Sequence, residues 1–320
     1  MYRSIPSSLR RLAVLGAVAL LGLAACGSDD AEPAAAPPAS EAPAVSEASA
    51  ATGAPMTSDA PASLKIVSLS PSATEMLFAI GAGADVIAVD DQSNFPDEAV
   101  AVQTDLSGYT PNVEAIAKYE PDLVVHDGTT DLGAQLQAIG IADWVGAAPV
   151  DFDDIYVQIE QLGAATGRVG EAAELVAQMQ ADIDAAVASV TEPVTPLRFY
   201  HELDDTLYSV TSNTFIGQVY GLFGLQNIAD TAEGTTDYPQ LSAEFVISQS
   251  PDLIFLADTK CCGQSIDTVG ARAGWDAVKA IANGGVIELD DDVASRWGPR
   301  VVGFVQQVAT AINAVQVAAP

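Results

Sequence analysis

Aromatic and hydrogen-bonding side chains follow apolar, strand-like runs at several points of this chain. Tyrosine and tryptophan offer flat apolar faces, whereas histidine, glutamine and arginine offer hydrogen-bond donors. In open α/β sheets, ligands bind beyond the carboxyl ends of the strands, so these side chains are expected to line one cleft for a bulky organic ligand. The set comprises Gln92, Tyr109 and His126 in the first half of the chain, and His201, Tyr238, Arg296 and Trp297 in the second.

Each of these residues also has a structural interpretation. Either histidine could be a hydrogen-bonded residue of the interior. The two tyrosines could be packing residues, although both begin a repeated segment described below, which favours a functional role. Arg296 could form a surface salt bridge, worth less than about 1 kcal/mol. The residues alone leave these alternatives open.

Sequence patterns typical of enzymes are missing. There is no G-x-S-x-G nucleophile elbow, no P-loop and no H-E-x-x-H metal motif. Gly81-Ala82-Gly83 follows a helical stretch rather than a strand, so it is expected to end a helix. The chain has two histidines, too few for a three-histidine zinc site. We therefore expect no catalytic residue, resident cofactor or metal ion, and a protein that is not an enzyme.

Two segments of the chain repeat one pattern. Residues 109–125 and 238–255 each read as an amphipathic helix, then Pro-Asp, then an apolar run typical of a strand buried in a parallel sheet. The same offset separates Glu114 from Glu244 and the proline of one segment from the proline of the other. One helix-to-strand unit in each half predicts two similar α/β lobes.

The lobes are expected to occupy residues 64–150 and 196–320. Between them, residues 151–195 show helical periodicity with one break, around Thr166-Gly167-Arg168. This segment has no partner in the repeat. We expect a single long helix that joins the lobes as a stiff spine and permits only small closure.

The N-terminus has the pattern of a lipoprotein signal peptide, expected over residues 1–26. Three arginines flank or precede the apolar run Leu12–Leu21, which is too short to span a bilayer. Leu23-Ala24-Ala25-Cys26 then resembles a bacterial lipobox, whose cysteine receives acyl chains. A cleaved signal with an incidental cysteine is the alternative. Residues 27–63, rich in Ala, Pro and Ser, are expected to be a disordered acidic tether to the extracytoplasmic face of the membrane.

The remaining two cysteines, Cys261 and Cys262, are adjacent in the sequence. Neighbouring cysteines cannot connect two separate elements, but they can close a vicinal disulfide ring or present two thiols. The ring is favoured because an exported chain meets an oxidising environment and offers no other free thiol.

The composition is strongly acidic. The chain contains 43 acidic and 12 basic residues and carries a formal net charge of −31. Phosphate groups would be repelled by such a surface, which argues against a nucleic-acid partner. Most of these carboxylates are expected to lie on a solvated outer face.

Several motifs together resemble a known family. Ile66-Val67-Ser68-Leu69-Ser70-Pro71-Ser72-Ala73-Thr74-Glu75, the two Pro-Asp-Leu units and Arg296-Trp297-Gly298-Pro299-Arg300 look like those of the Fe/B12-type substrate-binding proteins of ABC importers. The resemblance covers residues 64–317. It implies two Rossmann-like lobes joined by one long backbone helix, which is the class III architecture. It also implies a monomer that works with an ABC permease and its ATPase, with the ligand between the lobes.

The resemblance implies roles for particular residues. Glu114 and Glu244 match the segments in which members of the family carry the glutamates that meet permease arginines, so both are expected to dock the permease. Tyr238 matches a tryptophan that lines the B12 pocket of the vitamin B12 receptor, within a shared aromatic-Pro-Gln pattern. Gln92 falls where that receptor has a pocket tyrosine.

Three transported ligands are compatible with the resemblance, namely a ferric siderophore, haem or a corrinoid such as cobalamin. Siderophores are usually anionic and would need Arg296, Lys260 or Arg272. Haem would need axial ligands, which His126 and Tyr238 could supply.

Two other functions remain as alternatives. The first is a lipoprotein sensor or adhesin on the same fold. The second is an exported enzyme or metal-binding protein that uses His126, His201 and the cysteine pair.

Overall fold

The computed structural model describes residues 63–191, 193, 195–234 and 236–318. The expected signal peptide with Cys26, and all of the expected tether except Ser63, lie outside these residues. Among the helices that are described, none combines the length and the apolar character needed to cross a membrane.

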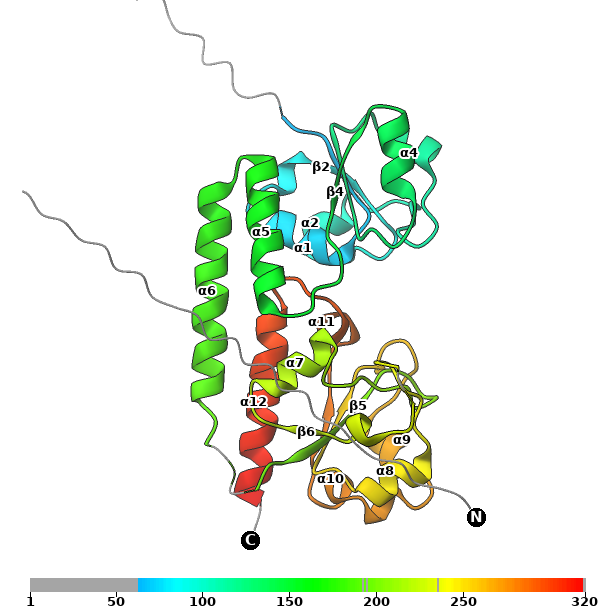
Figure 1. Ribbon diagram of the computed structural model, residues 1–320, viewed down its shortest axis with the longest axis vertical. Coiled ribbons are helices and arrows are strands. Elements are labelled where there is room, and N and C mark those ends of the chain that lie inside the picture. Colours follow the sequence, from blue (N-terminus) through cyan, green and yellow to red (C-terminus); the bar gives the residue numbers. More distant parts are fainter. Residues whose placement is uncertain (1–62, 192, 194, 235, 319–320) are drawn as a thin grey trace, which may run out of the picture. The chain divides into compact units, whose positions relative to one another are not determined.

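Four parallel strands form the sheet of the first lobe, in the order β2-β1-β3-β4 (Figure 1). The central strands β1 and β3 are fully buried, as expected for apolar strands of a parallel sheet. The strands are β1 (Ile66–Ser68), β2 (Val86–Val89), β3 (Leu123–His126) and β4 (Ala142–Val145); the helices are α1 (Pro71–Ala79), α2 (Asp97–Val100), α3 (Val113–Ala117) and α4 (Leu132–Ala138), with a 3-10 turn at Gly83–Asp85.

The second lobe repeats this topology, since its parallel strands follow the order β6-β5-β7-β8. The strands are β5 (Arg198–Glu202), β6 (Gln226–Asn227), β7 (Leu253–Leu256) and β8 (Val286–Glu288). The helices are α7 (Phe215–Gly221), α8 (Ala243–Gln249), α9 (Ile266–Gly270), α10 (Lys279–Ala282), α11 (Asp291–Ser295) and α12 (Val301–Ala318), with 3-10 turns at Ile228–Thr231 and Trp275–Ala277.

The repeated sequence segment forms the same unit in both lobes, because α3 leads into β3 and α8 leads into β7. Asn112 and Ser242 cap these helices by accepting a hydrogen bond from a backbone amide three residues later. Glu120 and Ser250, which each precede the proline, have positive φ angles of 49° and 41°. A residue before proline avoids the right-handed helical region, so the helical conformation stops before the proline in both copies of the repeat.

The segment between the lobes differs from the single helix expected over residues 151–195. It forms α5 (Phe152–Thr166) and α6 (Val169–Ala188), which lie side by side (Figure 1). Gly167 ends α5 with a φ angle of 70°, a left-handed conformation that glycine adopts easily. α5 packs on α1 of the first lobe. α6 packs on α5 and on α12, the last helix of the second lobe, so α6 corresponds to the long helix that joins the lobes in this class.

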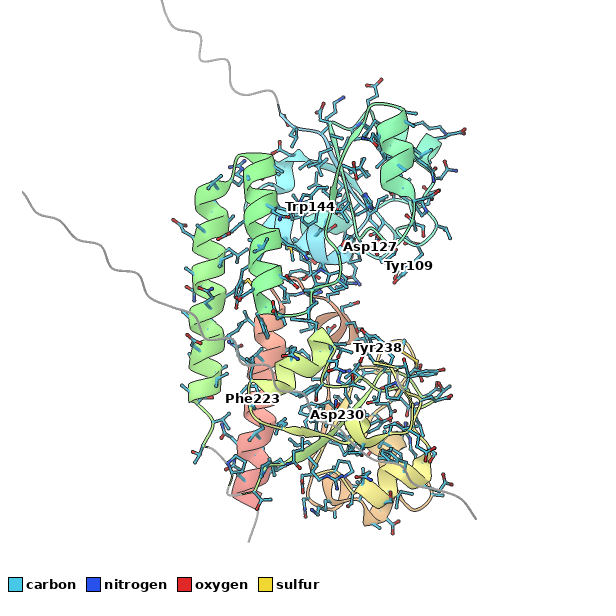
Figure 2. The ribbon with its side chains drawn as sticks, viewed as in Figure 1. Tyr109, Asp127, Trp144, Phe223, Asp230 and Tyr238 are labelled. Carbon is cyan, nitrogen blue, oxygen red and sulfur yellow. A yellow bond between two sulfur atoms is a disulfide. The ribbon has the colours of Figure 1, made fainter. Side chains whose placement is uncertain are left out.

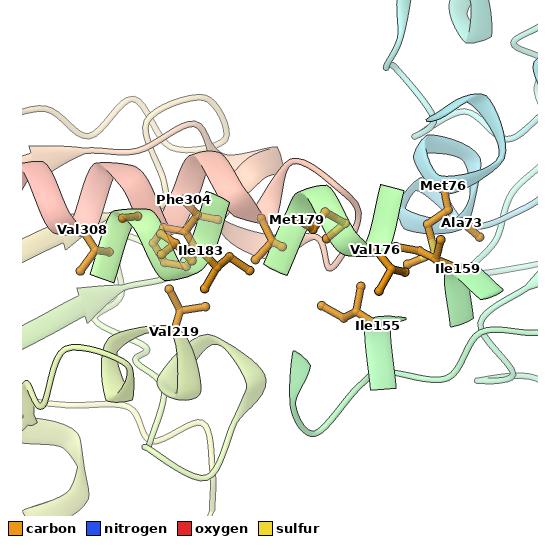
Figure 3. Packing of buried hydrophobic residues seen from close by; sticks show 14 of the residues in the cluster. Ala73, Met76, Ile155, Ile159, Val176, Met179, Ile183, Val219, Phe304 and Val308 are labelled. Atoms are coloured by element: carbon orange, nitrogen blue, oxygen red, sulfur yellow. The ribbon is translucent and has the colours of Figure 1, made fainter. Parts of the chain in front are cut away.

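One apolar core connects these helices (Figure 3). Ala73 and Met76 of α1 meet the apolar face of α5. Farther along the cluster, Met179 and Ile183 of α6 lie with Phe304 of α12. Since side chains of both lobes belong to this cluster, α5 and α6 form a packed support for the two lobes rather than a flexible linker.

Candidate ligand-binding site

A buried carboxylate on α1 binds two arginines that follow the second sheet. Glu75 is the acceptor; its Oε1 lies 3.2 Å from Nη1 of Arg296, and its Oε2 accepts from Nε of Arg300 at 2.9 Å. The Glu75 side chain is 1% exposed, so water screens these ion pairs weakly. The contact fixes the segment between α11 and α12 against the first lobe.

Further hydrogen bonds reinforce this junction. Arg296 also donates to the backbone oxygen of Gln92 at 3.0 Å and to Oδ1 of Asp292 at 2.8 Å. Asn94 of the first lobe donates to Asp292 at 3.2 Å. The Trp297 amide donates to the Ser72 hydroxyl at 3.3 Å. Arg296 therefore already holds four acceptors, counting Glu75 and the Asn94 side-chain oxygen.

Above this junction lies a cleft of about 270 Å³ whose walls come from both lobes. It brings together four of the expected ligand-binding residues: Gln92, Tyr109, Arg296 and Trp297. It also contains four carboxylates that sequence reasoning missed, namely Asp90, Asp127, Asp291 and Asp292.

A second depression of about 220 Å³ adjoins the cleft, because Ser295 and Trp297 line both. Tyr238 lies in this second space. Its other walls are mainly apolar and include Pro149, Val150, Phe215 and Ile216. The first space is the more acidic one, whereas the second is more apolar although Asp237 also lines it; Trp297 lines both.

The two expected tyrosines are available for stacking. Tyr109 is 77% exposed and Tyr238 is 51% exposed. Figure 2 shows them on loops of the two lobes that face one another, with Asp127 near Tyr109. Large exposed aromatic side chains at the mouth of a cleft suit the flat face of an organic ligand.

The electrostatics of the cleft are dominated by carboxylates. Burial raises the pKa of Asp90, despite hydrogen bonds from Ser93 that oppose the shift. Within the part of the chain that the structure describes, Arg296 is the one basic residue of the lining. Its guanidinium group is bound to Glu75 and to Asp292 of the lining, so it offsets part of the acidic charge and is not free to pair with a ligand.

The other two basic residues considered for an anionic ligand are also paired. Lys260 lies 2.7 Å from Asp290 and 2.9 Å from Asp292. Arg272 binds Glu202, with 2.7 Å between Nη1 and Oε2. Neither residue lines the cleft. The positive charges expected to hold a siderophore are therefore neutralised by neighbouring carboxylates.

His126 is placed inside the first lobe rather than at the cleft. It is the last residue of β3 and is 4% exposed. Its Nε2 lies 3.2 Å from Asp143, and its Nδ1 accepts from the Gly128 amide at 3.2 Å. With both ring nitrogens occupied and the ring buried, His126 does not line the cleft, in contrast to its expected position.

His201 is buried in the core of the second lobe, which corrects its assignment to the cleft. It lies within β5, is 0% exposed and shares a hydrogen bond of 2.7 Å with the Tyr220 hydroxyl. Burial lowers the pKa of His201 to about 3, so the ring is neutral. The two histidines and the cysteine pair do not gather at one place, and the described residues contain no group of three potential metal ligands.

The two cysteines form a disulfide in the loop after β7. They do not line the cleft, but the Cys261 amide donates to Asp291 at 2.9 Å, and Asp291 does line it. The disulfide loop therefore contacts the cleft wall from behind.

The residues expected to dock a permease lie on the surface. Glu114 and Glu244 are both exposed, and each is in the first turn of its helix, α3 or α8. Across the described ranges, neither takes part in an ion pair within the chain. Both carboxylates are thus available to an external partner.

A larger depression lies outside the cleft. It measures about 580 Å³, and its apolar walls include Phe78, Val86 and Phe95. Glu75 lines it from one side, and the Glu75–Arg296 ion pair lies between it and the cleft. None of the side chains expected to contact a ligand lies in it.

The chain is similar to proteins of bacterial uptake systems. The model of the periplasmic binding protein family matches residues 66–293. Over 257 residues the chain is 28% identical to YvrC of Bacillus subtilis, an uncharacterised ABC transporter substrate-binding lipoprotein, covering 78% of this chain and 79% of that one. Over 261 residues it is 28% identical to the vitamin B12-binding protein of Vibrio cholerae, covering 79% and 90%.

Among solved structures, the apo periplasmic haem-binding protein RhuT of Roseiflexus sp. RS-1 matches with a TM-score of 0.71. The match has 26% sequence identity and covers 79% of this chain and 100% of that one. The architecture is thus that of a class III substrate-binding protein, as the sequence predicted. The chain belongs to the periplasmic binding protein family, whose members are extracytoplasmic substrate-binding components of ABC transporters and not enzymes.

The carboxylates that sequence reasoning missed follow strands in the same way as the residues it found. Asp90 comes directly after β2, Asp127 directly after β3, and Asp291 and Asp292 shortly after β8. The rule that places ligands beyond strand ends would have selected them. In so acidic a chain, however, most carboxylates are expected on the solvated surface, so the position after a strand does not single these four out.

Proposed function

We propose that this protein captures a corrinoid, a large metal complex without net negative charge, and delivers it to an ABC permease. The observation that supports this proposal is the charge of the cleft. The described lining contains four carboxylates and one arginine, and this arginine is bound to Glu75 and Asp292. An anionic ligand would find no free basic side chain in the described lining and would lie near carboxylates such as Asp127, and like charges brought together in an interface are unfavourable.

The chemistry of a corrinoid fits both halves of the site. Its periphery carries amide groups, whose N–H donors suit the carboxylate of Asp127. Its flat macrocycle suits the exposed rings of Tyr109 and Tyr238 and the partly exposed Trp297. A corrinoid is larger than the two spaces, so part of it stays exposed or the lobes separate slightly when it enters.

Haem and ferric siderophores fit less well. Haem carries propionates and siderophores are usually anionic, so both need positive partners. His126, the expected axial ligand of haem, is buried and hydrogen-bonded to Asp143. The Vibrio cholerae relative is named a vitamin B12-binding protein, which favours the corrinoid further.

Delivery would use the two surface glutamates. Glu114 and Glu244 occupy the same position of the repeat, so they can meet equivalent arginines of a two-fold symmetric permease. Arginine–carboxylate pairs across an interface give register and fast association. An acylated Cys26 would hold the receptor near its transporter, and YvrC, a relative of this chain, is named a lipoprotein.

The test compares cyanocobalamin with derivatives in which a peripheral amide is hydrolysed to a carboxylate. These ligands have almost the same shape and differ by one negative charge. The proposal expects the full-length chain to bind cyanocobalamin at least about tenfold more tightly, since one charge repulsion of roughly 1.4 kcal/mol is at stake. In the Asp127→Asn variant, the affinities for cyanocobalamin and for the carboxylate derivative should lie closer together. Equal affinities for the amide and the carboxylate would refute the assignment.

A further inference from the structure

The Cys261–Cys262 disulfide has no part in the site described so far. A bond between neighbouring cysteines closes a small ring that includes their own peptide bond, so it holds that peptide unit in one conformation. Cys261 is exposed and Cys262 is partly exposed. A dissolved reductant can therefore reach the bond without unfolding the lobe.

The backbone before the ring is bound to a residue of the cleft wall. Oδ1 of Asp291 accepts from the Thr259 amide at 2.8 Å and from its hydroxyl at 2.8 Å. Oδ2 accepts from the amides of Lys260 and Cys261, both at 2.9 Å. Three successive amides on one carboxylate form an anion-binding turn with charge-assisted hydrogen bonds. The position of Asp291 thus depends on the backbone conformation of Thr259 to Cys261.

The backbone after the ring is anchored as well. The amides of Cys262 and Gln264 donate to the backbone oxygen of Asp258 at 3.3 Å and 3.2 Å. Oε1 of Gln264 accepts from Arg272 at 2.8 Å, and Arg272 binds the fully buried Glu202. The disulfide ring therefore lies between two attached ends of one short loop.

This loop also contributes charge beside the cleft. The Lys260 ammonium group lies within 2.9 Å of carboxylates on Asp290 and Asp292. Asp292 in turn accepts from Arg296, which binds Glu75 of the first lobe. A change in the loop would consequently move the donors that bind Asp290, Asp291 and Asp292, of which the last two line the cleft.

We propose that the Cys261–Cys262 bond is a redox modification site that sets the affinity of the cleft for its ligand. An external dithiol reduces it by thiol–disulfide exchange: the S–S bond of the protein breaks, each sulfur gains a proton, and the dithiol is oxidised to its own disulfide. Without the ring, the ψ angle of Cys261 is no longer fixed. The turn that presents the amides of Thr259, Lys260 and Cys261 to Asp291 is then less constrained, and the cleft wall loses its fixed position.

The expected effect is moderate. The reduced chain should bind its ligand roughly tenfold more weakly, which corresponds to about one charge-assisted hydrogen bond. The choice of ligand for this test rests on the proposed function, whereas the change in the loop does not. The two can therefore be measured separately.

The experiment uses the full-length chain in oxidised and reduced form. Reduction with a trialkylphosphine, followed by its removal under argon, leaves the ligand untouched by reductant; alkylation and mass spectrometry verify the state of the cysteines. Hydrogen exchange of the peptide over residues 257–264 reports the loop, and titration with cyanocobalamin reports the cleft. We expect faster exchange and weaker binding on reduction, with both restored by reoxidation. The Cys261→Ser/Cys262→Ser variant should behave as the reduced chain and ignore the phosphine.

Each outcome decides the matter. Unchanged hydrogen exchange on reduction would overturn the proposal whichever ligand binds. Faster exchange with unchanged affinity would overturn it too. If the oxidised chain binds no cyanocobalamin, the proposed function fails; the titration is then repeated with haemin, whose affinity must show the same dependence on the disulfide. The melting temperature of the serine variant shows whether it is folded, and the reduced native sequence provides the same comparison without substitution.

Discussion

The guanidinium group of Arg296 lies 3.2 Å from the carboxylate of Glu75, although the two residues are 221 positions apart in the chain. This ion pair has two consequences. It attaches the segment before α12 to α1 of the first lobe, and it removes the one positive charge that the described lining of the cleft could offer a ligand. The same contact therefore supports the arrangement of the lobes and the preference for a ligand without negative charge.

Loss of the buried carboxylate should destabilise the protein. Glu75→Gln keeps one acceptor oxygen but removes the negative charge shared by Arg296 and Arg300 and places an amide N–H group beside the two guanidinium groups. Breaking a buried ion pair costs about 3–5 kcal/mol, and partial exposure of the arginines reduces this to about 2 kcal/mol. Urea unfolding measures the change. Glu98→Gln, at an exposed site on α2, is the control; equal stabilities of the two variants would contradict the role of Glu75.

The exposed tyrosines should contribute to ligand affinity. Tyr109→Ala and Tyr238→Ala each remove one aromatic face, so each should weaken cyanocobalamin binding by about tenfold, or about 1.4 kcal/mol. Both side chains are largely exposed, so the free energy of unfolding should barely change. Tyr208→Ala removes another exposed tyrosine that lies outside the cleft. A loss of affinity in that control equal to the loss in the other two would argue against stacking.

Buried Asp258 should make the stability depend on pH. It is 0% exposed, and burial next to Glu202 raises its pKa to about 8. From about pH 4 to pH 8 the folded chain keeps this proton and the unfolded chain does not, so its contribution to stability falls as pH rises and is lost above the folded pKa. The free energy of unfolding then falls by up to about 1.4 kcal/mol per pH unit, the limit for one proton.

The variant Asp258→Asn tests this dependence, because it stays uncharged at every pH. Urea unfolding between pH 6.5 and pH 9 should show a clearly smaller fall in stability than in the native chain. This range lies above the region in which neutral His201, with its pKa of about 3, costs stability. Asp276→Asn, at an exposed site of the same lobe, should keep the native slope. A native slope in Asp258→Asn would show that Asp258 is already ionised in the folded state.

Permease docking should need both surface glutamates. Glu114→Lys/Glu244→Lys places two positive charges opposite permease arginines, so it should reduce uptake of labelled cyanocobalamin at least about tenfold, as expected when like charges meet in an interface. The affinity of the isolated receptor should be unchanged. Glu160→Lys/Glu174→Lys makes the same change in charge on exposed sites of α5 and α6. Equal uptake in the two double variants would rule out the docking role.

Much of this fold could be predicted from the sequence, because the repeated unit and the residues after strand ends are visible in short stretches of the chain. The repeated helix-to-strand unit predicted two similar lobes, and Tyr109, Tyr238 and Trp297 were found as residues beyond strand ends. The break at Gly167 was visible too, but whether a broken helix continues or folds back depends on what its faces pack against. Here α1 and α12 cover different halves of the segment, so it forms two helices.

The rest depended on detail that a single sequence does not carry. The sequence predicts strands that stop at Val125 and at His201, whereas β3 extends to include His126 and β5 extends one residue past His201. Within a strand, alternate side chains point to opposite faces, and these two point into packed cores. The neutralisation of Arg296 by Glu75 depends on tertiary contacts across most of the chain, which local patterns do not report.

The most direct test of the central claim is a calorimetric titration of the purified full-length chain with cyanocobalamin and, separately, with haemin at pH 7. A cleft whose arginine is neutralised and whose walls are acidic should bind one cyanocobalamin with a Kd below about 1 μM, equivalent to about −8 kcal/mol, and haemin at least tenfold more weakly. Tighter binding of haemin, or no heat with cyanocobalamin, would contradict the account.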